Sequence, residues 1–377
     1  MEKRRIDAFG AEISLLGFGC MRLPVLEGAS EKIDYPAAQR MVDRAIAAGV
    51  NYFDTAWPYH NKMSEVFVGE ALAKYPRDRY YLASKMPTWE QFASPQADME
   101  KLFSQQLEKC RTAYFDFYLV HALDAEHYAA MQRYGMYDFL SRKKAEGAIR
   151  HLGFSFHDNP QLLKEIVKNY AWEFAQIQLN YLDWELQDAK AQYEILTENR
   201  IPVIVMEPVR GGALASLNER ALEILRKAAP GASPASWALR FAASLPAVMT
   251  VLSGMSSLEQ VEDNIKTFSD FRPLSDAEGE TLREAAAAYR ASGAIPCTNC
   301  RYCADCPAGV NIPRIFSIYN LYQVNKSKDS FKGNYRTLLD SEKAHNCVSC
   351  GQCMSHCPQG LKIPDRLKEI AAFAAAG

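Results

Sequence analysis

The strongest constraint on the fold is a regular alternation of strand-like and helix-like segments between residues 51 and 268. Short apolar runs predict strands at residues 51–54, 80–85, 115–121, 151–155, 174–179, 202–206 and 248–253. Helical spacing predicts helices between them, most clearly at residues 35–49, 97–107, 136–146, 160–168, 186–197 and 258–268. Such alternation, with no antiparallel run, indicates a parallel sheet with helices covering it.

An additional strand at residues 13–19 brings the number of strand–helix units to eight, which favours a closed (β/α)₈ TIM barrel. The alternative is a doubly wound open sheet, which would need a phosphate-binding glycine turn early in the chain. Gly17-Phe18-Gly19 lacks the third glycine of that motif, because position 22 is Arg22. We therefore favour the barrel.

The length and composition agree with one barrel and a small second domain. The chain has 377 residues, of which 48% are hydrophobic and 23% charged, so it can bury a large core. Its net charge of −2 argues against nucleic acid as a partner, and no apolar run is long enough to span a membrane. Residues 1–7 lack an apolar signal core, so we expect a cytoplasmic protein. Gly293 and Pro296 follow a helix predicted from residue 276 to residue 292, and they suggest a domain boundary between residues 1–292 and 293–377.

Polar side chains end three consecutive predicted strands. Asp54, Lys85 and His121 occupy these ends, and Tyr59 lies on the loop after the first of them. In a barrel these ends meet at one rim, where the chemistry of such folds is located. We expect Asp54 to pair with a buried Lys85, because a buried lysine needs a partner. We further expect Lys85 to lower the pKa of Tyr59, making the tyrosine a proton donor near neutral pH, and His121 to orient a substrate oxygen.

These four residues resemble the catalytic tetrad of the aldo-keto reductases, and the resemblance extends over residues 5–268. It also rests on Gly17-Phe18-Gly19-Cys20-Met21, Gly153-Phe154-Ser155, Gln178 within residues 176–180, and the helix start at residues 259–264. The resemblance implies a (β/α)₈ barrel that binds NADPH or NADH without a Rossmann domain and reduces a small carbonyl compound to an alcohol. In such a reaction Tyr59 would protonate the carbonyl oxygen.

The resemblance also implies a set of nucleotide contacts. These are Gly19, Cys20, Met21, Asp54, Ser155, Gln178, Met206, Arg210, Gly211, Ser253, Gly254, Ser256, Gln260 and Asn264. Arg210 and Gly211 are placed on the pyrophosphate through their Gly-rich loop. The chain departs from the family where Phe156 follows Ser155, where Met206 replaces an aromatic residue, and where Ser256 stands in place of a cation for the 2′-phosphate. Both NADP and NAD therefore stay open.

Two cysteine runs follow the barrel. The first contains Cys297, Cys300, Cys303 and Cys306, followed by proline, and the second contains Cys347, Cys350, Cys353 and Cys357, again followed by proline. The spacing resembles that of bacterial ferredoxins with two [4Fe–4S] clusters, in which the cysteine before proline serves the other cluster. This resemblance assigns Cys357 to the first set of three cysteines and Cys306 to the second set. The alternative is a pair of zinc sites, although zinc ribbons seldom place four cysteines at this spacing.

The 40 residues between the cysteine runs are long for a compact ferredoxin, and residues 312–322 have helical spacing. We therefore expect a mainly helical, ferredoxin-like dicluster domain, similar to the C-terminal extension of some prokaryotic aldo-keto reductases. A nicotinamide delivers two electrons as hydride, whereas each cluster takes one electron, so we expect carbonyl reduction and the clusters to be only loosely coupled. A redox partner protein is a further expectation. The alternative function is an electron-transfer or regulatory subunit whose barrel binds nucleotide without turnover.

Overall fold

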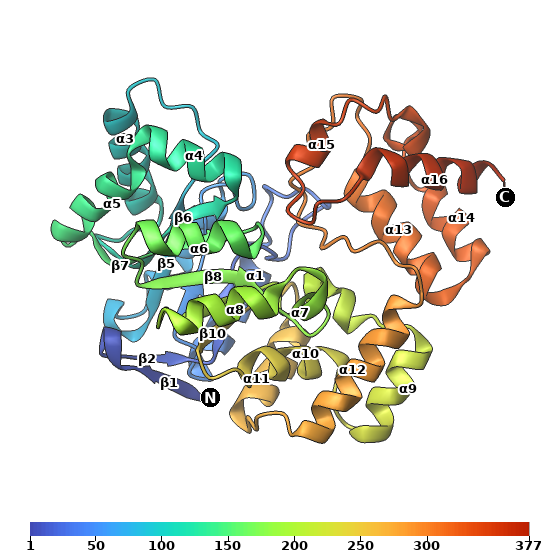
Figure 1. The fold of residues 1–377 in the computed structure, drawn as a ribbon, viewed down its shortest axis with the longest axis horizontal. Coiled ribbons are helices and arrows are strands. Elements are labelled where there is room, and N and C mark those ends of the chain that lie inside the picture. Colours follow the sequence, from blue (N-terminus) through green and yellow to red (C-terminus); the bar gives the residue numbers. More distant parts are fainter. Residues whose placement is uncertain (377) are drawn as a thin grey trace. The chain divides into compact units, whose positions relative to one another are not determined.

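We describe residues 1–376 of the protein from a computed structural model, in which eight parallel strands form a closed barrel (Figure 1). The strands follow one another around the barrel in chain order, and the last pairs with the first. They are β3 (Leu16–Gly19), β4 (Tyr52–Asp54), β5 (Tyr81–Met86), β6 (Phe115–Leu123), β7 (Ile149–Phe156), β8 (Phe174–Gln178), β9 (Val203–Met206) and β10 (Val248–Gly254). The predicted barrel is therefore confirmed.

Burial on both faces explains why these strands are continuous apolar runs. All nine residues of β6, for example, are buried. The register pairs Asp54 with Gly19 on one side and with Ala83 on the other, so the carboxyl ends of β3, β4 and β5 lie at one rim. Lys85 lies two residues beyond Ala83 and therefore on the same face of β5.

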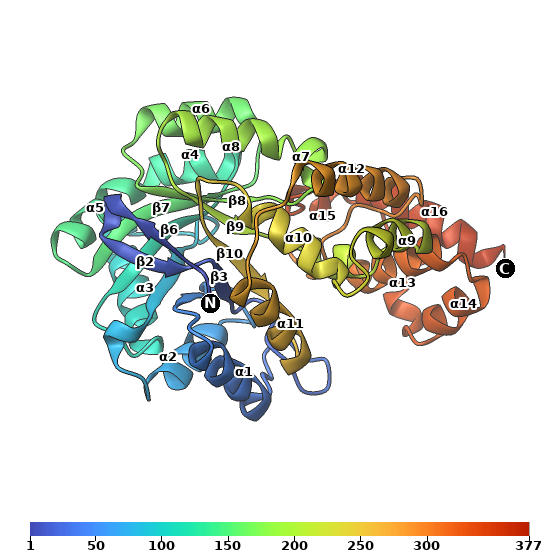
Figure 2. The same ribbon diagram turned by 90° about the horizontal axis from the view of Figure 1, so that it is seen from below.

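Helices alternate with these strands (Figure 2). They are α1 (Tyr35–Ala47), α2 (Ser64–Leu72), α3 (Pro95–Lys109), α4 (Ala125–Tyr134), α5 (Met136–Ala145), α6 (Pro160–Asn169), α7 (Asp183–Leu186), α8 (Ala189–Glu198) and α11 (Leu258–Ser269). Side-chain caps define several starts: Asp34 accepts the Ala37 N–H before α1, and Ser257 accepts the Gln260 N–H before α11. The helix predicted at residues 186–197 is divided into α7 and α8 at Asp188, whose φ is +49°. No helix among residues 1–376 is long and apolar enough to cross a membrane.

An antiparallel hairpin precedes the barrel and was not predicted. Strand β1 (Lys3–Ile6) pairs with β2 (Ala11–Ser14), and the short helix η1 (Asp7–Phe9) joins them. Ile13 of β2 is fully buried in one apolar cluster with Tyr52 and Phe117 of the barrel strands. The predicted strand at residues 13–19 is thus two strands: β2 of the hairpin ends at Ser14, and the first barrel strand, β3, begins at Leu16.

The chain forms two compact units, and their boundary differs from the predicted one at residue 292. One unit contains the barrel strands, from residue 1 to 208 and from 238 to 274. The other combines residues 209–237 with the chain from residue 275 onward. In this second unit α9 (Glu219–Ala228) packs along α12 (Asp276–Arg290), which buries Leu225 and Leu282. The helix α10 (Pro234–Ala243) crosses the boundary.

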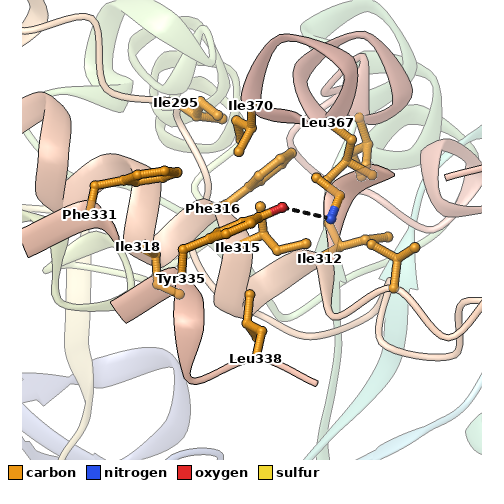
Figure 3. Packing of buried hydrophobic residues seen from close by; sticks show 13 residues of the cluster. Ile295, Ile312, Ile315, Phe316, Ile318, Phe331, Tyr335, Leu338, Leu367 and Ile370 are labelled. Carbon is orange, nitrogen blue, oxygen red and sulfur yellow. Dashed lines mark hydrogen bonds between the residues drawn. The ribbon is translucent and has the colours of Figure 1, made fainter. Parts of the chain in front are cut away.

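The part of the second unit after residue 292 is helical, with no strand among its described residues. It contains α13 (Ile312–Asn325), α14 (Lys328–Arg336), α15 (Gln352–Ser355), α16 (Ile363–Ala375) and the short helices η4 (Asp340–Glu342) and η5 (Ala344–Asn346). Its core includes Ile315 and Phe316 of α13 and Leu367 of α16 (Figure 3). The Tyr335 hydroxyl accepts the Ala344 N–H at 3.0 Å, which fixes the approach to the second cysteine run.

Candidate functional site

A buried lysine lies at the centre of the polar groups at the barrel rim. The Lys85 ammonium donates to Asp54 Oδ1 at 2.7 Å and to the Thr55 carbonyl at 2.8 Å. The same nitrogen is 3.4 Å from the Tyr59 hydroxyl. Lys85 is 0% exposed and Asp54 is 3% exposed, so water screens this pair poorly. The structure thus places Lys85 between the predicted acid and the predicted proton donor.

The protonation of Tyr59 differs from the expectation. Burial raises the pKa of Tyr59 well above 10, and the nearby carboxylates of Asp54 and Glu207 raise it further. The prediction that Lys85 lowers this pKa was therefore wrong. At the hydroxyl, burial and the two carboxylates outweigh the ammonium, which lies 2.7 Å from Asp54 and 3.4 Å from the hydroxyl. Tyr59 consequently keeps its proton at neutral pH.

The side chain of His121 lies beside Tyr59, with the two ring centroids 6.0 Å apart. The ring of Trp89 is centred 5.0 Å from the imidazole on another side. Burial lowers the pKa of His121 well below 6.5, and the positive charge of Lys85 lowers it further. Among the protein atoms of residues 1–376, His121 Nδ1 has no hydrogen-bond partner. A neutral imidazole with an unused ring nitrogen can bind a polar atom of a ligand.

Several predicted nucleotide contacts lie where β3 and β10 end. Gly19 pairs with Gly254 in the parallel register, and Cys20 and Met21 continue from Gly19. The Asn264 amide donates to Ser253 Oγ at 2.9 Å, so α11 is tied to the end of β10. The Ser256 hydroxyl donates to the Arg22 carbonyl at 2.8 Å, and its N–H donates to Gln260 Oε1 at 2.8 Å. Ser256 and Gln260 are thus held together at this part of the rim.

Three further predicted contacts lie where β7, β8 and β9 end. Ser155 Oγ accepts the Ala122 N–H at 2.7 Å, which leaves the hydroxyl proton available for a ligand. Gln178 Nε2 donates to Asp183 at 2.7 Å, and Met206 ends β9. The hydroxyl of Ser155 and the amide of Gln178 provide the donors and acceptors that a nicotinamide carboxamide needs. These residues therefore fit the expected group.

An ion pair at the rim was missed from the sequence. The Arg22 guanidinium lies 2.8 Å from Glu207 Oε1, and the two side chains are 21% and 14% exposed. The pair joins the loop after β3 to the end of β9, and Glu207 has a φ of +53°. The only signal in the sequence was the arginine that replaces a glycine in the early Gly-rich run. Its partner is 185 residues away, so local patterns do not reveal the contact.

A second missed feature is a buried polar network behind Lys85. The Glu65 carboxylate is 0% exposed and accepts hydrogen bonds from Ser84 at 2.7 Å and from Gln106 at 2.6 Å. Gln106 also donates to the Lys85 carbonyl at 3.1 Å and accepts from Tyr118. Burial raises the pKa of Glu65, which these hydrogen bonds oppose. The network connects α2 and α3 to the strand that carries Lys85.

Arg210 and Gly211 are located in the second compact unit, where Gly211 packs against Thr298 of the first cysteine run and Arg210 contacts Gln359 just after the second. Arg210 is 2% exposed, and its guanidinium is 3.5 Å from Gln359 Oε1. A Cβ atom on Gly211 would lie 1.9 Å from the Thr298 carbonyl oxygen. Their assignment to the pyrophosphate stays a prediction.

The eight clustered cysteines line two hollows. One is lined by Cys297, Cys300, Cys303 and Cys357, and the other by Cys306, Cys347, Cys350 and Cys353, with Cys303 at its edge. The structure thus gathers the two sets of four that the ferredoxin resemblance assigns. In residues 1–376 no three histidine, cysteine or acidic side chains are close enough to hold one metal ion. The cysteine sulfurs surround a space, as the ligands of a multi-iron cluster do.

The two cysteine loops have the same backbone pattern. In the first, Asn299 and Arg301 have φ values of +54° and +68°. The corresponding residues of the second loop, Ser349 and Gly351, have φ values of +55° and +79°. Three of these four residues are not glycine, and the left-handed region costs them about 1–2 kcal/mol each. The shared strain indicates that both loops are shaped for the same kind of ligand.

Comparisons with known proteins agree with this geometry. Residues 15–287 match the Aldo/keto reductase family, and residues 296–361 match the 4Fe-4S dicluster domain. The chain is 26% identical to the uncharacterized oxidoreductase YqkF of Bacillus subtilis (strain 168), over 75% of this chain and 96% of that protein. It is 25% identical to L-galactose dehydrogenase of Arabidopsis thaliana, over 75% of this chain and 93% of that protein.

Among solved structures, the holo form of aldo-keto reductase AKR11C1 from Bacillus halodurans superimposes with a TM-score of 0.62 at 28% identity. The match covers 76% of this chain and 97% of that one. The dicluster match favours iron–sulfur ligation over the zinc alternative. The chain therefore belongs to the aldo/keto reductase family of oxidoreductases and carries a 4Fe-4S dicluster domain after its barrel.

Proposed function

We propose that this protein is an NAD(P)H-dependent reductase that converts the carbonyl group of a small molecule to an alcohol. The observation that carries the proposal is the buried Lys85 ammonium, which lies 2.7 Å from Asp54 and 3.4 Å from the Tyr59 hydroxyl. A tyrosine next to a buried cation can give up a proton and leave a stabilised phenolate. Membership of an oxidoreductase family supports the same chemistry.

The residues of the rim divide the work of this reaction. The reduced nicotinamide, when bound, supplies a hydride for the carbonyl carbon. Tyr59 donates its proton to the carbonyl oxygen, and Lys85 stabilises the negative charge left on the phenol oxygen. Asp54 holds Lys85 in place. His121, neutral because its pKa is lowered, binds the substrate oxygen and aligns it with Tyr59.

Ser155 and Gln178 are proposed to hold the nicotinamide carboxamide. The residues at the ends of β3 and β10 are proposed to bind the rest of the nucleotide. The choice between NADPH and NADH depends on the 2′-phosphate. Ser256 offers a hydroxyl where a cation would bind that phosphate, so NADH is a candidate alongside NADPH. Titration of the protein with each nucleotide, followed by fluorescence, measures the preference directly.

The second unit is proposed to hold two [4Fe–4S] clusters, one on each set of four cysteines. Each cluster, when bound, accepts or gives one electron. We propose that the carbonyl chemistry does not depend on the clusters, because hydride transfer moves two electrons together. Cys350 is exposed, so a redox partner protein could reach the second cluster. Exposed clusters of this kind fit a cytoplasm poor in oxygen.

The test is Tyr59→Phe, which removes the donated proton and keeps the ring. We expect the variant to bind nucleotide as the wild type does and to reduce carbonyl compounds at least 100-fold more slowly, as loss of a general acid costs about 10²–10⁴-fold. Unchanged turnover would remove Tyr59 as the proton donor. A wild-type protein that binds nucleotide and reduces no aldehyde or ketone would support the alternative, a nucleotide-binding electron-transfer or regulatory subunit.

The loose coupling is tested by mixing anaerobic, iron-loaded protein with NADPH and separately with NADH. We expect the nucleotide to bind without bleaching the cluster absorbance. Bleaching would mean that hydride electrons reach the clusters and that the proposed independence is wrong.

A further inference from the structure

The turn after the seventh barrel strand has an unusual backbone. Residues Arg210, Gly211 and Gly212 have φ values of +51°, +64° and +94° within the short helix η3 (Arg210–Ala215). Two glycines adopt such angles without penalty, but an arginine is strained there. Such strain persists only where the surroundings hold the residue in place.

Those surroundings are the first cysteine loop. Gly211 lies so close to Thr298 that an added Cβ would be 1.9 Å from the Thr298 carbonyl oxygen. Thr298 is 2% exposed and directly follows Cys297. At Gly212, by contrast, an added Cβ would meet nothing within 4 Å. Of the two glycines, Gly211 is therefore the one that packs against the cysteine loop.

Arg210 approaches the same site next to the segment that follows the second cysteine run. Its guanidinium contacts Gln359, two residues after Cys357, and both Gln359 and Thr298 line the hollow of the first cysteine set. The arginine side chain is nearly fully buried. Arg210 is set back from this hollow, behind Gln359. Four thiolates with a bound cluster would carry net negative charge, which would stabilise a buried cation at this position. A positive charge there also favours the reduced cluster, which carries one more negative charge.

We propose that Arg210 and Gly211 are part of the first cluster site. Gly211 allows the turn to support the loop from Cys297 to Cys300, and Arg210 raises the reduction potential of the cluster held by Cys297, Cys300, Cys303 and Cys357. Arg210 is a positioning residue, which acts on the cluster through charge and through Gln359. This inference rests on the proposed pair of clusters.

The first experiment measures reduction potentials in full-length, iron-loaded protein by redox titration followed by EPR. For Arg210→Gln we expect one of the two cluster potentials to fall by about 59 mV, which corresponds to a tenfold change in the one-electron equilibrium constant. Arg210→Lys, which keeps the charge, should recover most of the shift. Arg314→Gln is the matched control, because it removes an exposed arginine from the same unit, next to Pro313 in the lining of the same hollow, and solvent should reduce its effect to a small fraction.

The outcomes separate the inference from the proposed function. Iron analysis comes first: a wild-type protein without [4Fe–4S] clusters would overturn the proposed pair of clusters and this inference with it, and would leave the proposed carbonyl reduction to the Tyr59→Phe test. Clusters with potentials that Arg210→Gln leaves unchanged, or a loss of NAD(P)H affinity without a change in potential, would overturn the inference alone. An equal shift in Arg314→Gln would also overturn it, because any nearby charge would then suffice.

The second experiment compares Gly211→Ala with Gly212→Ala, which add the same methyl group at neighbouring positive φ angles. We expect Gly211→Ala to retain less iron and to change the EPR spectrum of one cluster, since the methyl group displaces Thr298. Gly212→Ala should add only backbone strain at its positive φ and keep both clusters. Equal iron content and identical spectra in the two variants would contradict the role of Gly211.

Discussion

Replacing Lys85 by methionine should destabilise the barrel strongly, because it leaves a buried carboxylate without its cation. Lys85 and Asp54 are almost fully buried and 2.7 Å apart. Asp54 Oδ2 already has no hydrogen-bond partner among the protein atoms of residues 1–376, so nothing else there compensates the charge. Removing one partner of a buried ion pair costs about 3–5 kcal/mol in unfolding free energy. For a domain of this size, about 2–4 °C per kcal/mol gives a fall in Tm of roughly 6–20 °C.

Tryptophan fluorescence is a suitable assay, because all five tryptophans precede residue 238 and four lie in the barrel unit. The signal therefore reports mainly on the barrel. The matched control is Lys32→Met, which breaks a pair of similar length to Glu27, 2.6 Å, with side chains 55% and 75% exposed. An exposed pair contributes about 1 kcal/mol or less, so this control should melt close to the wild type.

A double variant, Asp54→Asn with Lys85→Met, removes the charge left behind by the single change. We expect it to recover at least half of the lost stability, since no charged group is then buried alone. If Lys85→Met melts at the same temperature as Lys32→Met, the buried pair is no more important than a surface pair and the reasoning fails.

Three further predictions concern other parts of the molecule. Gly69→Ala should lower the barrel's stability by about 1–3 kcal/mol, because the new Cβ would lie 2.2 Å from the Lys109 carbonyl oxygen. The control is Gly279→Ala, where no atom lies within 4 Å of the new Cβ, and it should be neutral or stabilising by up to about 1 kcal/mol. Equal melting shifts in the two variants would contradict the packing argument. Burial opposes ionisation of Glu173, but hydrogen bonds from His151 and Lys144 prevail and lower its pKa to about 2. The ionised Glu173 therefore contributes fully to the free energy of unfolding above pH 4.5, and this contribution is lost as the pH falls from 4.5 toward 2. Acid titration should therefore show Glu173→Gln less stable than wild type at pH 6 and equal to it near pH 2; a constant difference would argue against this linkage. Chelation of iron, or Cys300→Ser, should make residues 293–376 sensitive to protease while the barrel resists, and resistance of both parts would show that the metal does not stabilise the domain.

Much of the fold was readable because the relevant signals are local. Parallel strands buried on both faces are apolar runs, and such runs predicted all eight barrel strands. The spacing of the cysteine runs likewise predicted a metal-binding domain, and the dicluster match agrees with that prediction. The strand ends also identified Asp54, Lys85 and His121 as residues of one rim, because a barrel brings all carboxyl ends of its strands together.

The sequence did not reveal that residues 209–237 belong to the second compact unit. Residues 209–237 come from the middle of the barrel pattern but pack with α12 and the cysteine domain, since the apolar faces of α9 and α12 match each other. Sequence distance hides that match. The same reason explains the Arg22–Glu207 pair and the approach of Gly211 to Thr298, which join residues far apart in the chain.

The sequence by itself determined which residues meet at the barrel rim and which cysteines fall into runs, because strand ends and loop spacing are properties of short segments. Tertiary structure alone decided the protonation of Tyr59. Its pKa depends on burial and on the distances of Lys85, Asp54 and Glu207 from one hydroxyl, and the sequence predicted the opposite direction. Electric fields depend on positions in space, and only the folded chain defines those positions.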